Sequence, residues 1–132
     1  MKGQALVELA ISMVFILLLL AGAVEFSIAF FQFIQLRDAA QEGGLNGAIC
    51  QDNERIYQRV VSSSDIPIDL RNNPDVMVDI AYGNVPPREG DGVTVTVSYR
   101  HKVFMPFLSK IVGEYLNLNA SVTDTILTTE GC

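Results

Sequence analysis

The chain has 132 residues, a net charge of −6 and 49% hydrophobic residues. This length leaves room for one domain with an appendage, and it argues against a multi-span transporter or a large enzyme. The acidic balance argues against nucleic acid as a partner. Charge is unevenly distributed, because residues 1–36 contain only three charged side chains, Lys2, Glu8 and Glu25. The sequence therefore joins an apolar N-terminal segment to a chain of ordinary soluble composition.

The apolar segment predicts a membrane-spanning helix. No charged residue lies between Leu9 and Val24, and no proline interrupts the segment. As a helix, residues 5–28 would span about 36 Å, enough to cross a hydrocarbon core of roughly 30 Å. A single segment in lipid satisfies its backbone hydrogen bonds only as a helix. A secretory signal cut after Ala23 is an alternative, opposed by Glu8, which stands where such signals are basic.

Two acidic residues lie within or beside this segment. An ionisable side chain in an apolar helix costs about 2.5–3.5 kcal/mol on insertion scales, so Glu8 predicts a functional contact with a cation on another chain. Glu25 lies ~26 Å farther along an ideal helix, near the opposite interface. A hydrated position at the membrane interface is the alternative for each.

Three segments resemble a known family of pilus proteins. Residues 2–8, KGQALVE, followed at once by the apolar run, resemble the N-terminus of type IV pilin-like proteins. The resemblance is greatest to the TadE family of the tight-adherence (Tad, type IVc) pilus systems. Residues 22–26, GAVEF, and residues 38–48, DAAQEGGLNGA, resemble two further segments of that family. The resemblance covers roughly residues 2–48 and is weaker over the rest of the chain.

The resemblance implies a processing step. A membrane prepilin peptidase would cut between Gly3 and Gln4 and remove residues 1–3 as a short leader. Glu8 would then be the fifth mature residue, as in pilins, about 6 Å along the helix axis from the new α-amino group. Pairing of Glu8 with that amine on a neighbouring subunit would offset the desolvation of both charges and fix the axial register. On this resemblance, Glu8 and Glu25 are assigned to subunit registration and assembly.

The resemblance also implies location and partners. The chain would cross the cytoplasmic membrane once with its N-terminus inside, and would reach the cell surface as part of a pilus after assembly. The implied partners are the membrane, a prepilin peptidase, other pilin subunits, and a pilus assembly platform with a cytoplasmic ATPase.

Beyond the membrane the pattern predicts two helical stretches. The first helix, residues 4–42, is expected to end at about Glu42, because Gly43, Gly44 and Gly47 break or bend helices. A second helix is predicted over Asn53–Ser63, with Asp52 as its N-cap.

Strands follow the second helix. Three segments alternate apolar and polar residues with period two, as strands with one buried face do: Val76–Tyr82, Val93–Tyr99 and Leu116–Val122. Phe104–Tyr115 is expected to form a crossover with a short helix over Leu108–Val112. The predicted class is α+β: a long transmembrane helix leading into a small extracytoplasmic domain, residues 43–132, with a second helix and an antiparallel sheet of about three strands.

The two cysteines, Cys50 and Cys132, both lie outside the membrane segment. A disulfide between them in an oxidising compartment would close a loop of ~80 residues, worth about 4–5 kcal/mol in the chain-entropy model. Two free thiols, or pairing with another chain, are the alternatives.

No catalytic residue, metal ligand or cofactor is predicted. The sequence has no phosphate-binding glycine loop, nucleophile elbow or zinc-protease motif. The single histidine, His101, is expected at the surface. The acidic residues Asp69, Asp75 and Asp79 lack the ligand spacing of a calcium loop and are expected to be solvated.

These observations predict a non-enzymatic structural subunit, a minor pilin or pseudopilin of a Tad-type pilus. The alternative is a single-span, membrane-anchored extracytoplasmic binding module that does not enter a filament. A secreted enzyme or inhibitor is a third possibility. The three differ in the first residue of the mature chain, which would be Gln4, Met1 or Val24 respectively.

Overall fold

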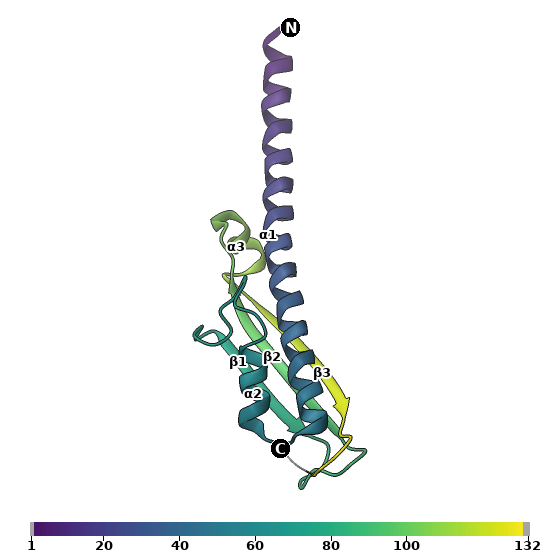
Figure 1. Ribbon diagram of the computed structural model, residues 1–132. Coiled ribbons are helices and arrows are strands. Elements are labelled where there is room, and N and C mark those ends of the chain that lie inside the picture. The colour runs from purple at the N-terminus through teal and green to yellow at the C-terminus, as the bar shows by residue number, and fades with distance from the viewer. Residues whose placement is uncertain (1, 131–132) are drawn as a thin grey trace.

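One long helix organises the molecule. The computed structural model describes residues 2–130, with side chains from residue 3 onward, and α1 runs over Lys2–Ile49. With 48 residues, α1 is about 72 Å long. Its N-terminal half projects alone, and its C-terminal half packs into a small domain (Figure 1). The other elements are α2 Asn53–Val61, β1 Val76–Tyr82, β2 Gly92–Lys102, α3 Pro106–Val112 and β3 Tyr115–Thr125.

The domain is a three-stranded antiparallel sheet covered on one face by helices. The strand order is β1-β2-β3, and α1 and α2 pack on the face that carries the alternating apolar residues. Val95 and Val97 of β2 are fully buried there, at the centre of the core. On the opposite face the hydroxyl groups of Thr96 and Ser121 lie 3.0 Å apart across β2 and β3. The predicted α+β class, with a long apolar helix, a second helix and three strands, is confirmed.

The second helix begins as the sequence predicts. Asp52 is the N-cap of α2, and its side chain accepts a hydrogen bond of 3.1 Å from the backbone N–H of Glu54. Ile56 and Val60 point into the core. The helix ends at Val61, before the expected end at Ser63.

The expected crossover between the last two strands is wrong. β2 and β3 are antiparallel neighbours, and Lys102 at the end of β2 stands opposite Tyr115 at the start of β3. The connection is therefore a long hairpin loop that contains α3. The apolar alternation marks each strand's buried face but carries no information on which strands are neighbours, so it could not distinguish a hairpin from a crossover.

The expected end of the first helix is also wrong, because α1 continues past Glu42 to Ile49. Its late glycines serve close packing. A Cβ atom at Gly43 would lie 2.5 Å from Cγ2 of Val60, and one at Gly47 would lie 2.9 Å from Cγ2 of Val93. Glycine therefore lets α2 and the sheet approach the α1 backbone more closely than any larger residue would allow.

A buried amide fixes the middle of α1 to the segment between α2 and β1. Nε2 of Gln35 donates to the backbone carbonyl of Ile68 at 2.7 Å, and the N–H of Ile68 donates to Oε1 of Gln35 at 2.8 Å. These two bonds satisfy the backbone N–H and carbonyl groups of Ile68, which lies in an irregular segment against the core.

Candidate functional site

The projecting half of α1 is the largest exposed apolar surface of the molecule. From Leu6 to Val24 its large apolar side chains are exposed, except Leu18, which is half-buried, and the most apolar window of the helix has no buried residue. Residues 3–24 would span about 32 Å, close to the thickness of a hydrocarbon core. In the described part of the chain, α1 alone has the length and composition to cross a membrane. This half of the helix fits membrane anchoring.

Two serine hydroxyl groups of α1 are satisfied within the helix itself. The hydroxyl of Ser12 donates to the carbonyl of Glu8 at 2.9 Å, and the hydroxyl of Ser27 donates to the carbonyl of Ala23 at 2.7 Å. Hydroxyl groups bonded in this way do not need water, which lowers the cost of placing them in an apolar environment.

Glu8 is different, because its carboxylate is exposed and has no partner among the described residues. The predicted processing residues Gly3 and Gln4 lie one turn earlier in the same exposed helix, and no other group lies within 4 Å of a Cβ placed on Gly3. The structure thus places all three on an accessible helix end. Their roles in processing and registration stay predictions.

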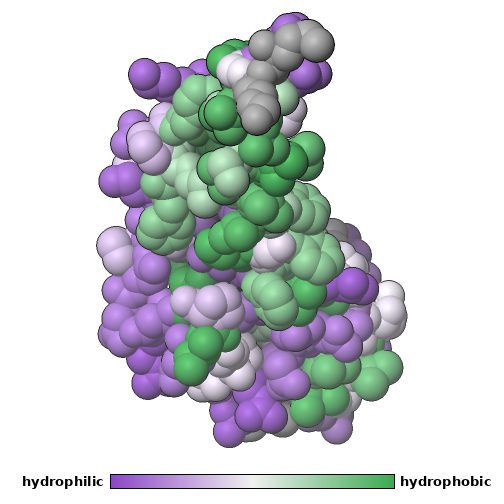
Figure 2. All heavy atoms as spheres, turned by 90° about the horizontal axis from the view of Figure 1, so that it is seen from above, coloured by the Kyte–Doolittle hydropathy of each residue, from purple (hydrophilic) through white to green (hydrophobic). Residues whose placement is uncertain are grey.

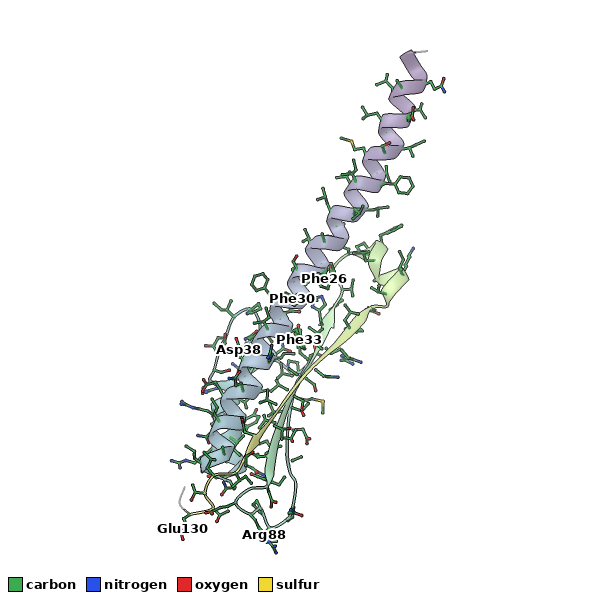
Figure 3. The ribbon with its side chains drawn as sticks, turned by 90° about the vertical axis from the view of Figure 1, so that its right-hand side faces the viewer. Phe26, Phe30, Phe33, Asp38, Arg88 and Glu130 are labelled. Atoms are coloured by element: carbon green, nitrogen blue, oxygen red, sulfur yellow. The ribbon has the colours of Figure 1, made fainter. Side chains whose placement is uncertain are left out.

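Glu25 has an internal partner that the sequence did not indicate. Its Oε1 lies 2.9 Å from Nε2 of His101 at the end of β2, and it accepts a hydrogen bond of 3.1 Å from the backbone N–H of Phe104. Both side chains are buried, with 5% of Glu25 and 1% of His101 exposed. We call this arrangement the Glu25 clamp. Figure 3 shows the neighbouring Phe26 where the projecting half of α1 meets the domain.

The Glu25 clamp joins α1 to the sheet at the point where the helix leaves the domain. A buried carboxylate is costly unless it is hydrogen-bonded, and here one oxygen has two donors. Oε2 of Glu25 and Nδ1 of His101 have no partner among the described residues. The clamp therefore positions the projecting helix relative to the domain, and a contribution of Glu25 to assembly would act through this positioning.

The expectation that His101 is a surface residue is wrong. His101 continues the buried, odd-numbered face of β2 that begins at Val93, so the period-two pattern contained the signal. Glu25 likewise stands at helical spacing from the buried residues Ala29 and Gln32, on the face of α1 that meets the sheet. Its position beside the apolar run obscured that pattern.

The cysteine prediction concerns one described residue. Cys50 follows α1 directly and is buried, and Nη1 of Arg55 lies 3.9 Å from its Sγ. Cys132 lies outside the described residues, so its pairing with Cys50 stays a prediction.

The acidic residues of the loops have structural partners. Asp75 forms an ion pair of 2.9 Å with Arg100. The side chain of Asp69 accepts hydrogen bonds from the backbone N–H groups of Arg71 and Asn72 and from the Asn72 amide. These bonds to Asn72 hold the pKa of Asp69 below its usual range. Among the described residues, no group of three potential ligands is placed to hold a metal ion.

The described residues form an α+β protein in which one long apolar helix, with the exposed carboxylate of Glu8, fits membrane anchoring. Residues 3–45 match the model of the family described as TadE-like protein, so this segment is similar to that family. The matched segment is nearly the whole of α1 and includes Gly3, Glu8 and Glu25. Such proteins are associated with the Tad pilus, and the family is structural. Comparisons with curated proteins and with solved structures give no match.

Proposed function

We propose that the chain is a structural subunit, a minor pilin or pseudopilin, of a Tad-type pilus. α1 anchors it in the cytoplasmic membrane before assembly, with the N-terminus inside, and packs against other subunits afterwards. The observation that carries this proposal is the Glu8 carboxylate, which is exposed and has no partner among the described residues, in a largely apolar, exposed half-helix. The TadE-like match over the same helix supports it.

An unpartnered carboxylate on this surface calls for a cation from another molecule. When the surface is buried in lipid or among helices, an isolated charge is strongly unfavourable. Cleavage between Gly3 and Gln4 creates an α-amino group, and in a bundle of such helices the amine of one subunit reaches Glu8 of its neighbour. Because a shift by one residue would leave both charges unpaired, the pair sets the axial register.

The surface of α1 also offers a place for a neighbouring helix. A shallow apolar groove runs along α1 beside the loop that carries Pro67, and the small residues Ala23 and Ser27 lie in its floor. Small residues four apart let two helix backbones approach closely. The proposed occupant is the apolar half of α1 from another pilin subunit, and the sheet domain supplies the outer lateral contacts.

The proposal includes the partners that processing and assembly need. A prepilin peptidase removes residues 1–3, and an assembly platform with its ATPase draws the subunit from the membrane into the filament at the cell surface. The chain has no enzymatic role in this scheme.

The test is incorporation into filaments in the native host. Pili are sheared from cells that express the wild-type chain, Glu8→Ala or Leu9→Ala, and the chain is quantified in the pilus and membrane fractions. Leu9→Ala is the matched control, since it shortens a neighbouring exposed side chain and keeps the charge. The proposal expects Glu8→Ala to remain in the membrane while Leu9→Ala enters the pili. Equal incorporation of both variants, or absence of the wild-type chain from pili, would overturn it.

A further inference from the structure

The connection between β2 and β3 carries an apolar surface that no described residue covers. Phe104, which precedes α3, is 71% exposed, and Phe107 and Ile111 of α3 are 57% and 69% exposed. No residue of α3 is buried. Phe107 and Ile111 are four residues apart and therefore lie on one side of the helix. We call Phe104, Phe107, Ile111 and Val112 the α3 apolar face. An exposed apolar cluster of this kind marks an interaction surface.

The α3 apolar face lies at the end of the domain from which the apolar half of α1 emerges. The backbone N–H of Phe104 donates to Glu25, which fixes the start of this surface beside the last residues of the exposed apolar run. Figure 1 shows α3 next to α1 at this end of the domain. Figure 2 looks along the helix onto the same end, where hydrophobic residues gather around the helix and hydrophilic residues occupy much of the rim.

The depth of this surface follows from the length of α1. If residues 3–24 cross the hydrocarbon core over about 32 Å, Glu25 and Phe104 lie at the outer interface. A short helix attached there, with aromatic and aliphatic side chains on an exposed face, has the composition of an interfacial helix. Aromatic side chains are enriched at this depth.

The segment around α3 has a small excess of basic residues, although the whole chain has a net charge of −6. Residues 100–115 contain Arg100, Lys102, Lys110 and Glu114, and because Arg100 is paired with Asp75, Lys102 and Lys110 stand against Glu114. Lys102 and Lys110 are exposed. Basic residues at a membrane surface are attracted by anionic lipid headgroups, at about 1 kcal/mol each.

We propose that the α3 apolar face is seated in the outer interface of the membrane that α1 spans, at the boundary between the acyl chains and the headgroups of an anionic bilayer. The domain then has two attachments to the bilayer, α1 and α3, and its orientation on the membrane is fixed. Extraction of a subunit requires α3 to leave the interface. The inference rests on the membrane anchoring in the proposed function and is independent of filament assembly.

Tryptophan fluorescence tests the seating directly, because the chain contains no tryptophan. The full chain is placed as a single copy in nanodiscs of mixed zwitterionic and anionic lipid, with Phe107→Trp or Ile111→Trp as the probe. Val85→Trp is the matched control, since Val85 is 88% exposed in the β1–β2 connection at the other end of the sheet, where Figure 3 labels Arg88. Lipids brominated on their acyl chains serve as the quencher.

The inference predicts that quenching at residues 107 and 111 exceeds quenching at residue 85 several-fold, and that emission at 107 and 111 is shifted to the blue. Equal quenching at residues 107, 111 and 85 would overturn it. A blue shift that arises only when several copies share a disc would also overturn it, in favour of a protein partner. Failure of the chain to remain with the discs would instead contradict the membrane anchoring itself.

Discussion

Replacing Gly43 by alanine tests the role of the late glycines in α1. The added methyl group would lie 2.5 Å from Cγ2 of Val60 and 3.0 Å from Cγ1 of Val95, and both valines are fully buried. Overpacking of this kind costs about 1–3 kcal/mol. Replacing glycine by alanine inside a helix stabilises the folded state by about 0.5–1 kcal/mol. The difference between these two ranges centres on a net loss of about 1 kcal/mol, or a drop in Tm of roughly 4–8 °C for a domain of this size.

The assay is thermal unfolding of the full chain in detergent micelles, followed by near-ultraviolet circular dichroism. Gly22→Ala is the control, because no group lies within 4 Å of a Cβ placed on Gly22, and its Tm is expected to stay level or rise. Val60→Ala removes the methyl group that Gly43→Ala would strike. The double variant should therefore be more stable than the sum of the two single effects by about 1 kcal/mol. A Gly43→Ala chain that unfolds at or above the wild-type temperature would refute the reasoning.

Three further substitutions probe other contacts. Glu25→Ala leaves the buried Nε2 of His101 and the backbone N–H of Phe104 without their partner, and chemical denaturation should show a loss of more than about 2 kcal/mol, against at most about 1 kcal/mol for Glu42→Ala in an exposed ion pair. Gln35→Ala leaves a buried backbone N–H and carbonyl unpaired, and the same assay should show a loss of about 2–3 kcal/mol. Burial, and then the charge of a nearby aspartate, raise the pKa of Tyr82 above its ordinary value of 10.0. The folded state therefore keeps this proton where the unfolded chain has lost it, so stability should fall as the pH rises above 10.0, and the fall should be smaller in Tyr82→Phe.

The elements that the sequence predicted well are those with a regular pattern. Continuous apolarity without a proline or a charge marked the projecting half of α1, and period-two alternation marked the three strands and their buried faces. Both patterns follow from repeating backbone geometry and do not depend on distant parts of the chain. The N-cap of α2 at Asp52 was equally local.

The features that the sequence did not reveal depend on contacts between distant residues. From the sequence alone, Gly43 predicts the end of a helix. The structure shows that glycine is needed there because Val60 and Val95 pack against it. From the sequence alone, Glu25 is interpreted as a carboxylate at the membrane interface. The fold brings His101, which is 76 residues away in sequence, into contact with it. In both cases local propensity is overridden by tertiary packing, which no single segment encodes.

The intact mass of the chain in sheared pili is the most direct test of the proposal that this chain is a processed pilus subunit. We expect a mature chain that begins at Gln4, is present in the pilus fraction and lacks Met1–Gly3. A chain that begins at Met1 and stays in the membrane would contradict the claim in favour of an anchored binding module. A chain that begins at Val24 would contradict both in favour of a secreted domain.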